Sequence, residues 1–326
     1  MINSRLRVCL AALFGAAGMC SATSSIHAAP AVTTTTPQAV APGQQIDVKL
    51  RGSGLAGASK LWTQFGAAAQ LTPDVKDNGK NAAEVTWRLN VPANVPVGIH
   101  GLRVAGPSGV SSLKLIMVDD LPSVAAAGNT TIDKAQELAL LTAVDGTMAN
   151  LSRNYYRIKV AAGQKLSFEV VARRLGSALD PLLRILDANG RELIYSDDEP
   201  GLRGDARLHY TFANAGEYVI EVRDIGYKGG AGHFYRLRVG DFPCLSSPYP
   251  MGVTRGSVAK VTFVGPDTDG VESVEVRTPS EPDINWVNVA ARRSNGKSSG
   301  FGMLRVEDGP VAVSLDRKST RLNSSH

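Results

Sequence analysis

Apolar and polar residues alternate through five short runs in the middle of the chain. In the first run, Tyr156, Ile158 and Val160 alternate with two basic residues. The apolar positions of the other four runs are Leu166, Phe168 and Val170; Leu208, Tyr210 and Phe212; Tyr218, Ile220 and Val222; and Tyr235, Leu237 and Val239. A period of two, broken by turns rich in Gly, Asn and Asp, predicts antiparallel strands with one buried and one solvent-facing side. We therefore expect a β-sandwich.

Two further strand-rich regions flank these runs. The first, residues 40–118, has Ile46, Val48 and Leu50 in alternation with polar residues. The second begins after Cys244 and repeats the glycine spacing around that run. The bracketing glycines are Gly43 and Gly52 in the first region and Gly256 and Gly265 in the second. This repeated spacing favours an array of similar units over one large domain.

The central region also resembles a known family. The resemblance rests on DPLLRILDANGRELIYSDDE (180–199), DARLHYTFANAGEYVIEVRD (205–224) and YRLRVGDFP (235–243). In this order the three stretches look like the bacterial pre-peptidase C-terminal domain. The resemblance implies a jelly-roll-like β-sandwich of secreted bacterial proteins, often attached to peptidases and related to the collagen-binding modules of collagenases.

The first flanking region resembles immunoglobulin-like domains of the TIG type, through PGQQIDVKLRGSGL and VPANVPVGIHGLRVAGPSGVSS. In that family a Pro-x-Gly-x-(His or Tyr) segment opens a late strand, and residues 96–100 have this form. The expected fold class is therefore all-β. We expect tandem β-sandwiches: an immunoglobulin-like domain, a jelly-roll-like pre-peptidase C-terminal domain and a truncated second immunoglobulin-like domain.

Both ends of the chain have special compositions. Arg5 and Arg7 precede an apolar run and then small residues, which is the order of a secretory signal peptide. At the other end, DRKSTRLNSSH (316–326) resembles a translated sequencing adapter, with a genuine basic tail as the alternative. If it is an artefact, the natural chain continues beyond Leu315 and this sequence is a fragment.

These observations predict the organisation of the chain. The expected parts are a signal peptide at 1–28, an immunoglobulin-like sandwich at 30–120, a linker at 121–131, a sandwich of the pre-peptidase C-terminal type at 132–243, an incomplete immunoglobulin-like domain at 244–315 and the adapter-like segment at 316–326.

Charge and cysteine content add little to the functional picture. The formal net charge is +5, and the predicted signal peptide and the adapter-like segment each contribute +2. The remaining +1 excludes the electrostatic footprint of a nucleic-acid-binding protein. Cys9 and Cys20 lie in the predicted signal peptide, so Cys244 has no intrachain partner in the mature chain.

An acidic cluster is the candidate metal site. Calcium takes six to eight oxygen ligands, which loop carboxylates and backbone carbonyls can supply. The candidate ligands are Asp180, Asp187, Asp197, Asp198, Asp205 and Asp224. The family resemblance points the same way, because related collagen-binding modules bind calcium. Relatives often open this domain with Glu-Pro-Asn-Asp, however, and this chain has Ala-Gly-Asn-Thr at 127–130. The alternative is that these carboxylates serve turns and ion pairs with nearby arginines.

No recognisable motif assembles a nucleophile, a base and an orienting group. His100, His209 and His233 lie in neither a Gly-x-Ser-x-Gly nor a His-Glu-x-x-His motif. We therefore expect an exported, secreted or periplasmic, non-catalytic module for adhesion, substrate targeting or envelope binding, whose partner is an extracellular or envelope polymer, protein or polysaccharide. We expect no membrane span after signal cleavage. The alternative is the N-terminal fragment of a secreted peptidase or other hydrolase whose catalytic domain is missing here.

Overall fold

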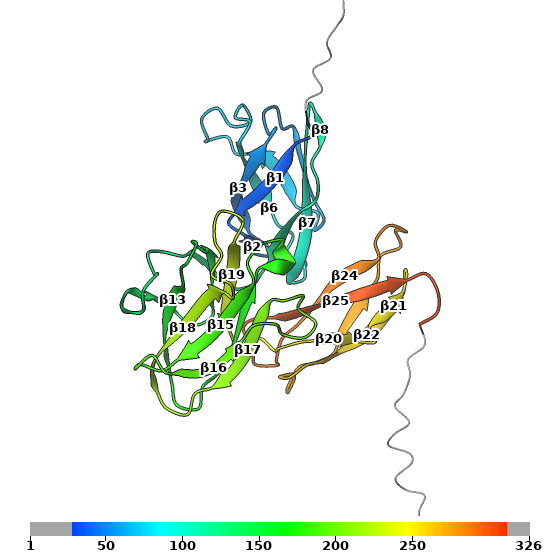
Figure 1. Cartoon of the computed structure of the whole chain (residues 1–326). Coiled ribbons are helices and arrows are strands. Elements are labelled where there is room, and N and C mark those ends of the chain that lie inside the picture. Colours follow the sequence, from blue (N-terminus) through cyan, green and yellow to red (C-terminus); the bar gives the residue numbers. More distant parts are fainter. Residues whose placement is uncertain (1–27, 312–326) are drawn as a thin grey trace, which may run out of the picture.

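The structure, a computed structural model, describes residues 28–311 and contains three β-sandwiches that meet at a common centre (Figure 1). The predicted signal peptide (up to residue 27) and the segment 316–326 lie outside the described residues. Strands make up the regular structure apart from two turns of 3₁₀ helix, η1 (Ile132–Lys134) and η2 (Arg173–Leu175). The prediction of an all-β fold of tandem sandwiches is confirmed. Among the described residues, no helix has the length and apolar character needed to cross a membrane.

The first sandwich, blue to cyan in Figure 1, packs the sheet β1-β3-β6-β5 on the sheet β2-β9-β7-β4, with β8 on the edge of β7. Its strands are β1 (Ala31–Thr36), β2 (Ala39–Val40), β3 (Gln45–Ser53), β4 (Lys60–Thr63), β5 (Ala68–Leu71), β6 (Glu84–Asn90), β7 (Gly98–Gly106), β8 (Gly109–Val110) and β9 (Lys114–Val118).

The second sandwich, green in Figure 1, packs the sheet β10-β12-β19-β14-β17 on the sheet β11-β13-β18-β15-β16. Its strands are β10 (Ser123–Ala125), β11 (Gln136–Glu137), β12 (Thr142–Thr147), β13 (Asn154–Val160), β14 (Lys165–Val171), β15 (Pro181–Leu186), β16 (Glu192–Ser196), β17 (Ala206–Thr211), β18 (Gly216–Asp224) and β19 (Phe234–Gly240). The segment expected to be a linker thus contributes the edge strand β10.

The third sandwich, yellow to red, packs the sheet β20-β22-β23 on the sheet β21-β25-β24. Its strands are β20 (Ser247–Tyr249), β21 (Gly252–Thr254), β22 (Val258–Val264), β23 (Val274–Arg277), β24 (Trp286–Ala291) and β25 (Gly300–Glu307).

The core of the second sandwich follows the alternation in the sequence. Leu166 on β14 lies opposite Tyr210 on β17, and Phe168 lies opposite Leu208. Because partners in an antiparallel pair share a face, one set of alternating residues enters the core. Phe168 and Phe212 pack edge to face there, with ring centroids 6.3 Å apart.

The opposite face of this sheet differs from the prediction. The sequence predicted that residues alternating with Tyr235, Leu237 and Val239 face solvent, but the side chains of Arg236 and Arg238 are 0% exposed. The prediction is wrong here because other parts of the chain cover this face: Arg238 donates to Asp119, just after β9, and to the carbonyl of Ser299 in the third sandwich.

A network of charges fills this covered face. The Asp119 carboxylate lies 2.7 Å from Arg236 and 3.1 Å from Arg238, and all three side chains are fully buried. Arg238 also contacts Glu169 at 2.7 Å, and Glu169 contacts Arg174 at 2.7 Å. Each charge therefore has a partner of opposite sign, which buried ions require.

The pKa values of the two acids reflect this pairing. Burial alone would raise the pKa of Asp119, but Arg238 and Arg236 outweigh it and lower the pKa. Burial likewise opposes ionisation of Glu169, whereas Arg174 and Arg238 lower its pKa to about 2. Both carboxylates are therefore ionised at neutral pH, and the network consists of true ion pairs.

An apolar cluster completes the junction. It takes Met117 from the first sandwich, Leu175 and Phe234 from the second and Phe301 from the third. The Asn288 carboxamide ties the third sandwich to the first, since it donates to the Ile99 carbonyl at 2.8 Å and accepts from the Ile99 N–H at 3.3 Å. A Cβ on residue 98 would lie 2.4 Å from Asn288, so Gly98 is needed for this approach. Tight packing and buried charge thus hold the three sandwiches in one arrangement.

We predict that Asp119→Asn lowers the free energy of unfolding by about 3–5 kcal/mol, because it leaves two buried guanidinium groups without their shared anion. Chemical denaturation measures this loss. Asp77→Asn is the control: Asp77 pairs with Lys80 on the surface, with side chains 56% and 77% exposed, and exposed pairs contribute little. A similar small change in both variants would contradict a stabilising role for the network.

Candidate binding cleft

A cleft of about 480 Å³ lies where the three sandwiches meet. The first sandwich contributes Gln64 and Leu113 to its lining, the loop between β16 and β17 contributes Leu202 and Arg203, and the third contributes Trp286 and Met303. A cleft of this size, with apolar side chains and a few polar groups, is typical of a ligand-binding site. It exists only while the junction holds the three sandwiches together.

The floor of the cleft is the outer face of the sheet β21-β25-β24. Asn288 lies opposite Met303, and Trp286 lies two residues before Asn288 on the same face. The valines between them, Val287 and Val289, point to the other side and pack in the core of the third sandwich. The outer face therefore carries the aromatic and polar side chains of this strand.

This face passes from buried to open along its length. Phe301 is 5% exposed at the junction, whereas Met303 is 45% and Trp286 46% exposed. The Trp286 ring is flanked by Arg305, whose guanidinium carbon lies 5.9 Å from the ring centroid. An exposed tryptophan ring beside a preformed cleft makes this surface the candidate interaction site.

Polar groups lie beside this aromatic surface. Gln64 is exposed, and its side-chain oxygen accepts a hydrogen bond from the Gly101 N–H at 2.9 Å, so its side-chain NH2 group is available to donate. Arg203 is exposed, with φ of +56°, and pairs with no carboxylate in the part of the chain that the structure describes. The cleft can therefore donate hydrogen bonds next to an apolar stacking surface.

The six aspartates predicted to bind calcium are dispersed over the second sandwich. No three of them bring carboxylate oxygens within 4.8 Å of one another among residues 28–311. Asp197 and Asp198 are neighbours on a half-exposed to exposed loop. Asp187 lies in the turn between β15 and β16, where it accepts from the N–H groups of Asn189 and Arg191 at 2.9 Å.

The other three aspartates accept hydrogen bonds from backbone N–H groups, pair with arginine, or do both. Asp205 is fully buried and accepts from Arg173 N–H at 2.7 Å and from the Arg174 guanidinium at 2.7 Å. Asp224 accepts from the N–H groups of Asp180 at 2.9 Å and of Gly226 at 2.9 Å. Asp180 also pairs with Arg173 at 2.9 Å. These contacts match the turn and ion-pair alternative, and calcium binding stays a prediction.

Four aromatic residues of the second sandwich differ in their exposure. Tyr155 and Phe234 are buried, whereas Tyr195 is exposed. Tyr227 is partly buried, with Arg223 4.6 Å from its ring centroid and Arg153 donating to its hydroxyl at 2.9 Å. The expectation from sequence missed Trp286. Trp286 alternates with Val287 and Val289 along its strand. This alternation was the available signal, because it places the Trp on the face turned away from the valines of the core.

No protein-family model matches the chain. No curated protein matches it. Among solved structures, it is similar to the pre-peptidase C-terminal domain of collagenase from Bacillus anthracis, at 18% identity over 32% of this chain and 93% of that chain, with a TM-score of 0.27.

Two further similarities to solved structures cover more of this chain. One is to SGBP-B of the mixed-linkage glucan utilization locus of Bacteroides ovatus, in complex with a heptasaccharide: 9% identity, 60% of this chain, 74% of that chain, TM-score 0.23. The other is to the secreted serine protease VesC from Vibrio cholerae: 11% identity, 61% of this chain, 47% of that chain, TM-score 0.23. At these identities and TM-scores, function has to be inferred from the geometry of this chain itself.

Calcium binding by the six aspartates predicts that the melting temperature of the chelator-treated protein rises when calcium is added to millimolar concentration, because an ion that binds the native state stabilises it by mass action. Magnesium is the control, since it demands a tighter octahedral site than calcium does. An unchanged melting temperature with calcium would exclude the site.

Proposed function

We propose that this chain is an exported, non-catalytic binding protein that holds a polysaccharide of the extracellular space or the cell envelope in the cleft around Trp286. The observation that carries the proposal is the exposed Trp286 in a preformed cleft. A tryptophan ring offers a large rigid apolar face, which can stack on the apolar face of a sugar ring and lose its contact with water.

The polar groups of the cleft support a sugar over an apolar ligand. Gln64 and Arg203 can donate hydrogen bonds to hydroxyl groups, and both come from sandwiches other than the one that carries Trp286. A ligand that spans these groups contacts all three sandwiches. An open cleft of this kind suits an internal segment of a long polymer, which has to enter from the side.

The lining also favours binding over cleavage. Glycoside hydrolysis normally uses two carboxylates that flank the scissile bond. Within the described residues, the cleft is lined by no Asp, Glu, His or Cys side chain. This composition supports a module that retains its ligand without transforming it. Export follows from the predicted signal peptide and is part of the proposal.

We expect Trp286→Ala to weaken binding to the cognate polysaccharide by roughly 30-fold, which corresponds to the loss of about 2 kcal/mol typical of an aromatic binding hot spot. Affinity electrophoresis against a panel of soluble glucans, xylans and mannans, followed by calorimetric titration of the polymer that binds, measures the effect.

Trp62→Ala is the matched control, because Trp62 is 47% exposed but lies outside the cleft lining. Equal binding by the Trp286→Ala variant and the wild type would show that the cleft is not the site. Retention by collagen or another protein in place of every glycan would identify a protein ligand. Release of reducing sugar from any bound polymer would contradict the non-catalytic assignment.

A further inference from the structure

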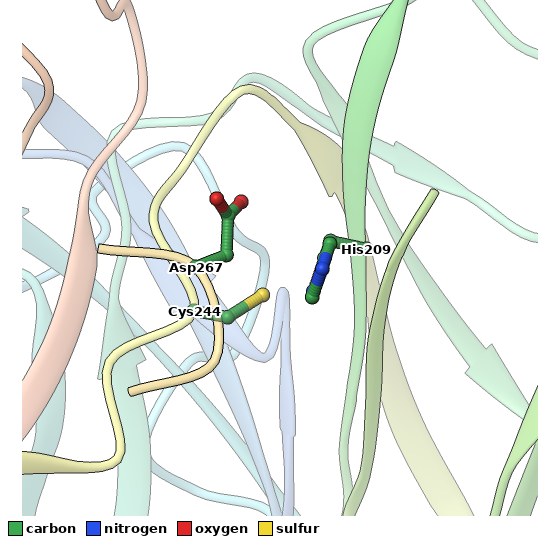
Figure 2. A group of neighbouring side chains, drawn as sticks. All are labelled: His209, Cys244 and Asp267. Atoms are coloured by element: carbon green, nitrogen blue, oxygen red, sulfur yellow. The ribbon is translucent and has the colours of Figure 1, made fainter. Parts of the chain in front are cut away.

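Three side chains with different ligand atoms converge where the third sandwich meets the second. The imidazole of His209, the sulfur of Cys244 and the carboxylate of Asp267 place one ligand atom each within 4.8 Å of one another. Figure 2 shows the Cys244 sulfur directed at the His209 ring, with Asp267 beside them. This trio is separate from the cleft around Trp286, whose lining includes none of its members.

The fold fixes the three positions through backbone contacts. His209 lies opposite Ser167 in the β14–β17 pair, on the outer face of the sheet. The segment that carries Cys244 is held against that face, since Ser167 Oγ donates to the Phe242 carbonyl at 2.6 Å and Arg207 donates to the Leu245 carbonyl at 2.6 Å.

Asp267 is joined to Cys244 by the backbone. The two residues form an isolated antiparallel bridge, with the Cys244 N–H donating to the Asp267 carbonyl at 3.2 Å. His209 therefore comes from the second sandwich, whereas Cys244 and Asp267 come from the chain that enters the third. An ion held by all three would tie these two parts together.

We propose that His209, Cys244 and Asp267 bind one divalent transition-metal ion, of which Zn²⁺ is the best match. Zinc accepts thiolate sulfur, imidazole nitrogen and carboxylate oxygen in one tetrahedral shell. Neighbouring ligand atoms in such a shell are separated by about 3.4–3.7 Å at the usual bond lengths of about 2.0–2.3 Å. Atoms that already lie within 4.8 Å need to approach by roughly 1 Å to complete such a shell.

The ligand atoms have capacity for an ion. The His209 ring forms no hydrogen bond within the part of the chain that the structure describes, so either nitrogen can coordinate. Lys165 contacts one oxygen of Asp267 and Arg293 contacts the other. Each carboxylate oxygen has two lone pairs, so one on each oxygen stays available while the two cations orient the group.

The surroundings supply an entry path and negative charge. A pocket of about 460 Å³ reaches His209 and Cys244, and its rim carries Asp197, Asp198 and Glu199 against the single guanidinium of Arg207. This rim offsets the two cations on Asp267 and attracts a dication. Its open side leaves the fourth coordination position to water or to a rim carboxylate. The Cys244 thiol gives up its proton when a metal ion binds, so binding releases protons.

The test uses Co²⁺, a spectroscopic substitute for zinc, on the chelator-treated full chain. The starting protein is the Cys9→Ser/Cys20→Ser variant, which leaves Cys244 as the sole cysteine in the chain. We expect one equivalent of Co²⁺ to produce a near-ultraviolet thiolate charge-transfer band and the strong visible bands of tetrahedral cobalt. One equivalent of Zn²⁺ should abolish both and raise the melting temperature.

The variants separate a built site from adventitious binding. Cys244→Ser should remove the charge-transfer band. Loss of a residue that only supports a metal ligand weakens metal binding by about 10–100-fold, and His209→Gln should weaken Co²⁺ binding by more than this. The matched controls are His233→Gln, in the loop before β19, and Asp269→Asn, an exposed aspartate two residues from Asp267. Both should bind Co²⁺ as the starting protein does.

Three outcomes would overturn the proposal: absence of the charge-transfer band in the starting protein, its persistence after Cys244→Ser, or cobalt binding that is equally weak in His209→Gln and His233→Gln. If Cys244→Ser does not fold, as judged by its melting transition, the His209→Gln and His233→Gln pair decides the question.

Discussion

The carboxylate of Asp119 lies between the guanidinium groups of Arg236 and Arg238, and water reaches none of the three. An ion buried in this way costs several kcal/mol unless its partners stay in place, so the surrounding segments cannot move apart independently. Asp119 follows the last strand of the first sandwich, and Arg238 reaches the third through the Ser299 carbonyl. One charge network thus couples all three sandwiches, where tandem domains otherwise move relative to one another.

The cleft depends on this coupling. The aromatic floor of the cleft belongs to the third sandwich, and the hydrogen-bond donors Gln64 and Arg203 belong to the first and the second. No single sandwich presents the complete surface. The trio of His209, Cys244 and Asp267 has the same character, because it too combines side chains from two parts of the chain. Both proposed sites lie where sandwiches meet, which is a common location for ligand sites in multidomain proteins.

Much of the fold could be predicted from the sequence, and the physical reason is simple. The alternation of Leu166, Phe168 and Val170 predicts β14 because a strand sends successive side chains to opposite faces. The same pattern could not predict that Arg236 and Arg238 are buried. Alternation identifies which residues share a face, but what covers that face is decided by segments far away in the chain, here Asp119 and Ser299.

The sites were harder to predict for related reasons. Carboxylates serve turns, arginines and metal ions equally well, so the sequence alone could not distinguish a calcium ligand from an aspartate that holds backbone N–H groups, as Asp205 and Asp224 do in the structure. Conversely, His209 and Cys244 are distant in sequence and belong to no metal-binding motif, and only the folded chain brings them together. Trp286 could have been predicted to lie on the outer face, because it alternates with the valines of β24.

Small-angle X-ray scattering of residues 28–311 tests whether the buried charges fix one arrangement of the three sandwiches. We expect a scattering curve that this arrangement reproduces at both low and high salt, because buried ion pairs are screened far less than exposed ones. A larger radius of gyration that requires a mixture of arrangements, or one that grows with salt, would contradict it.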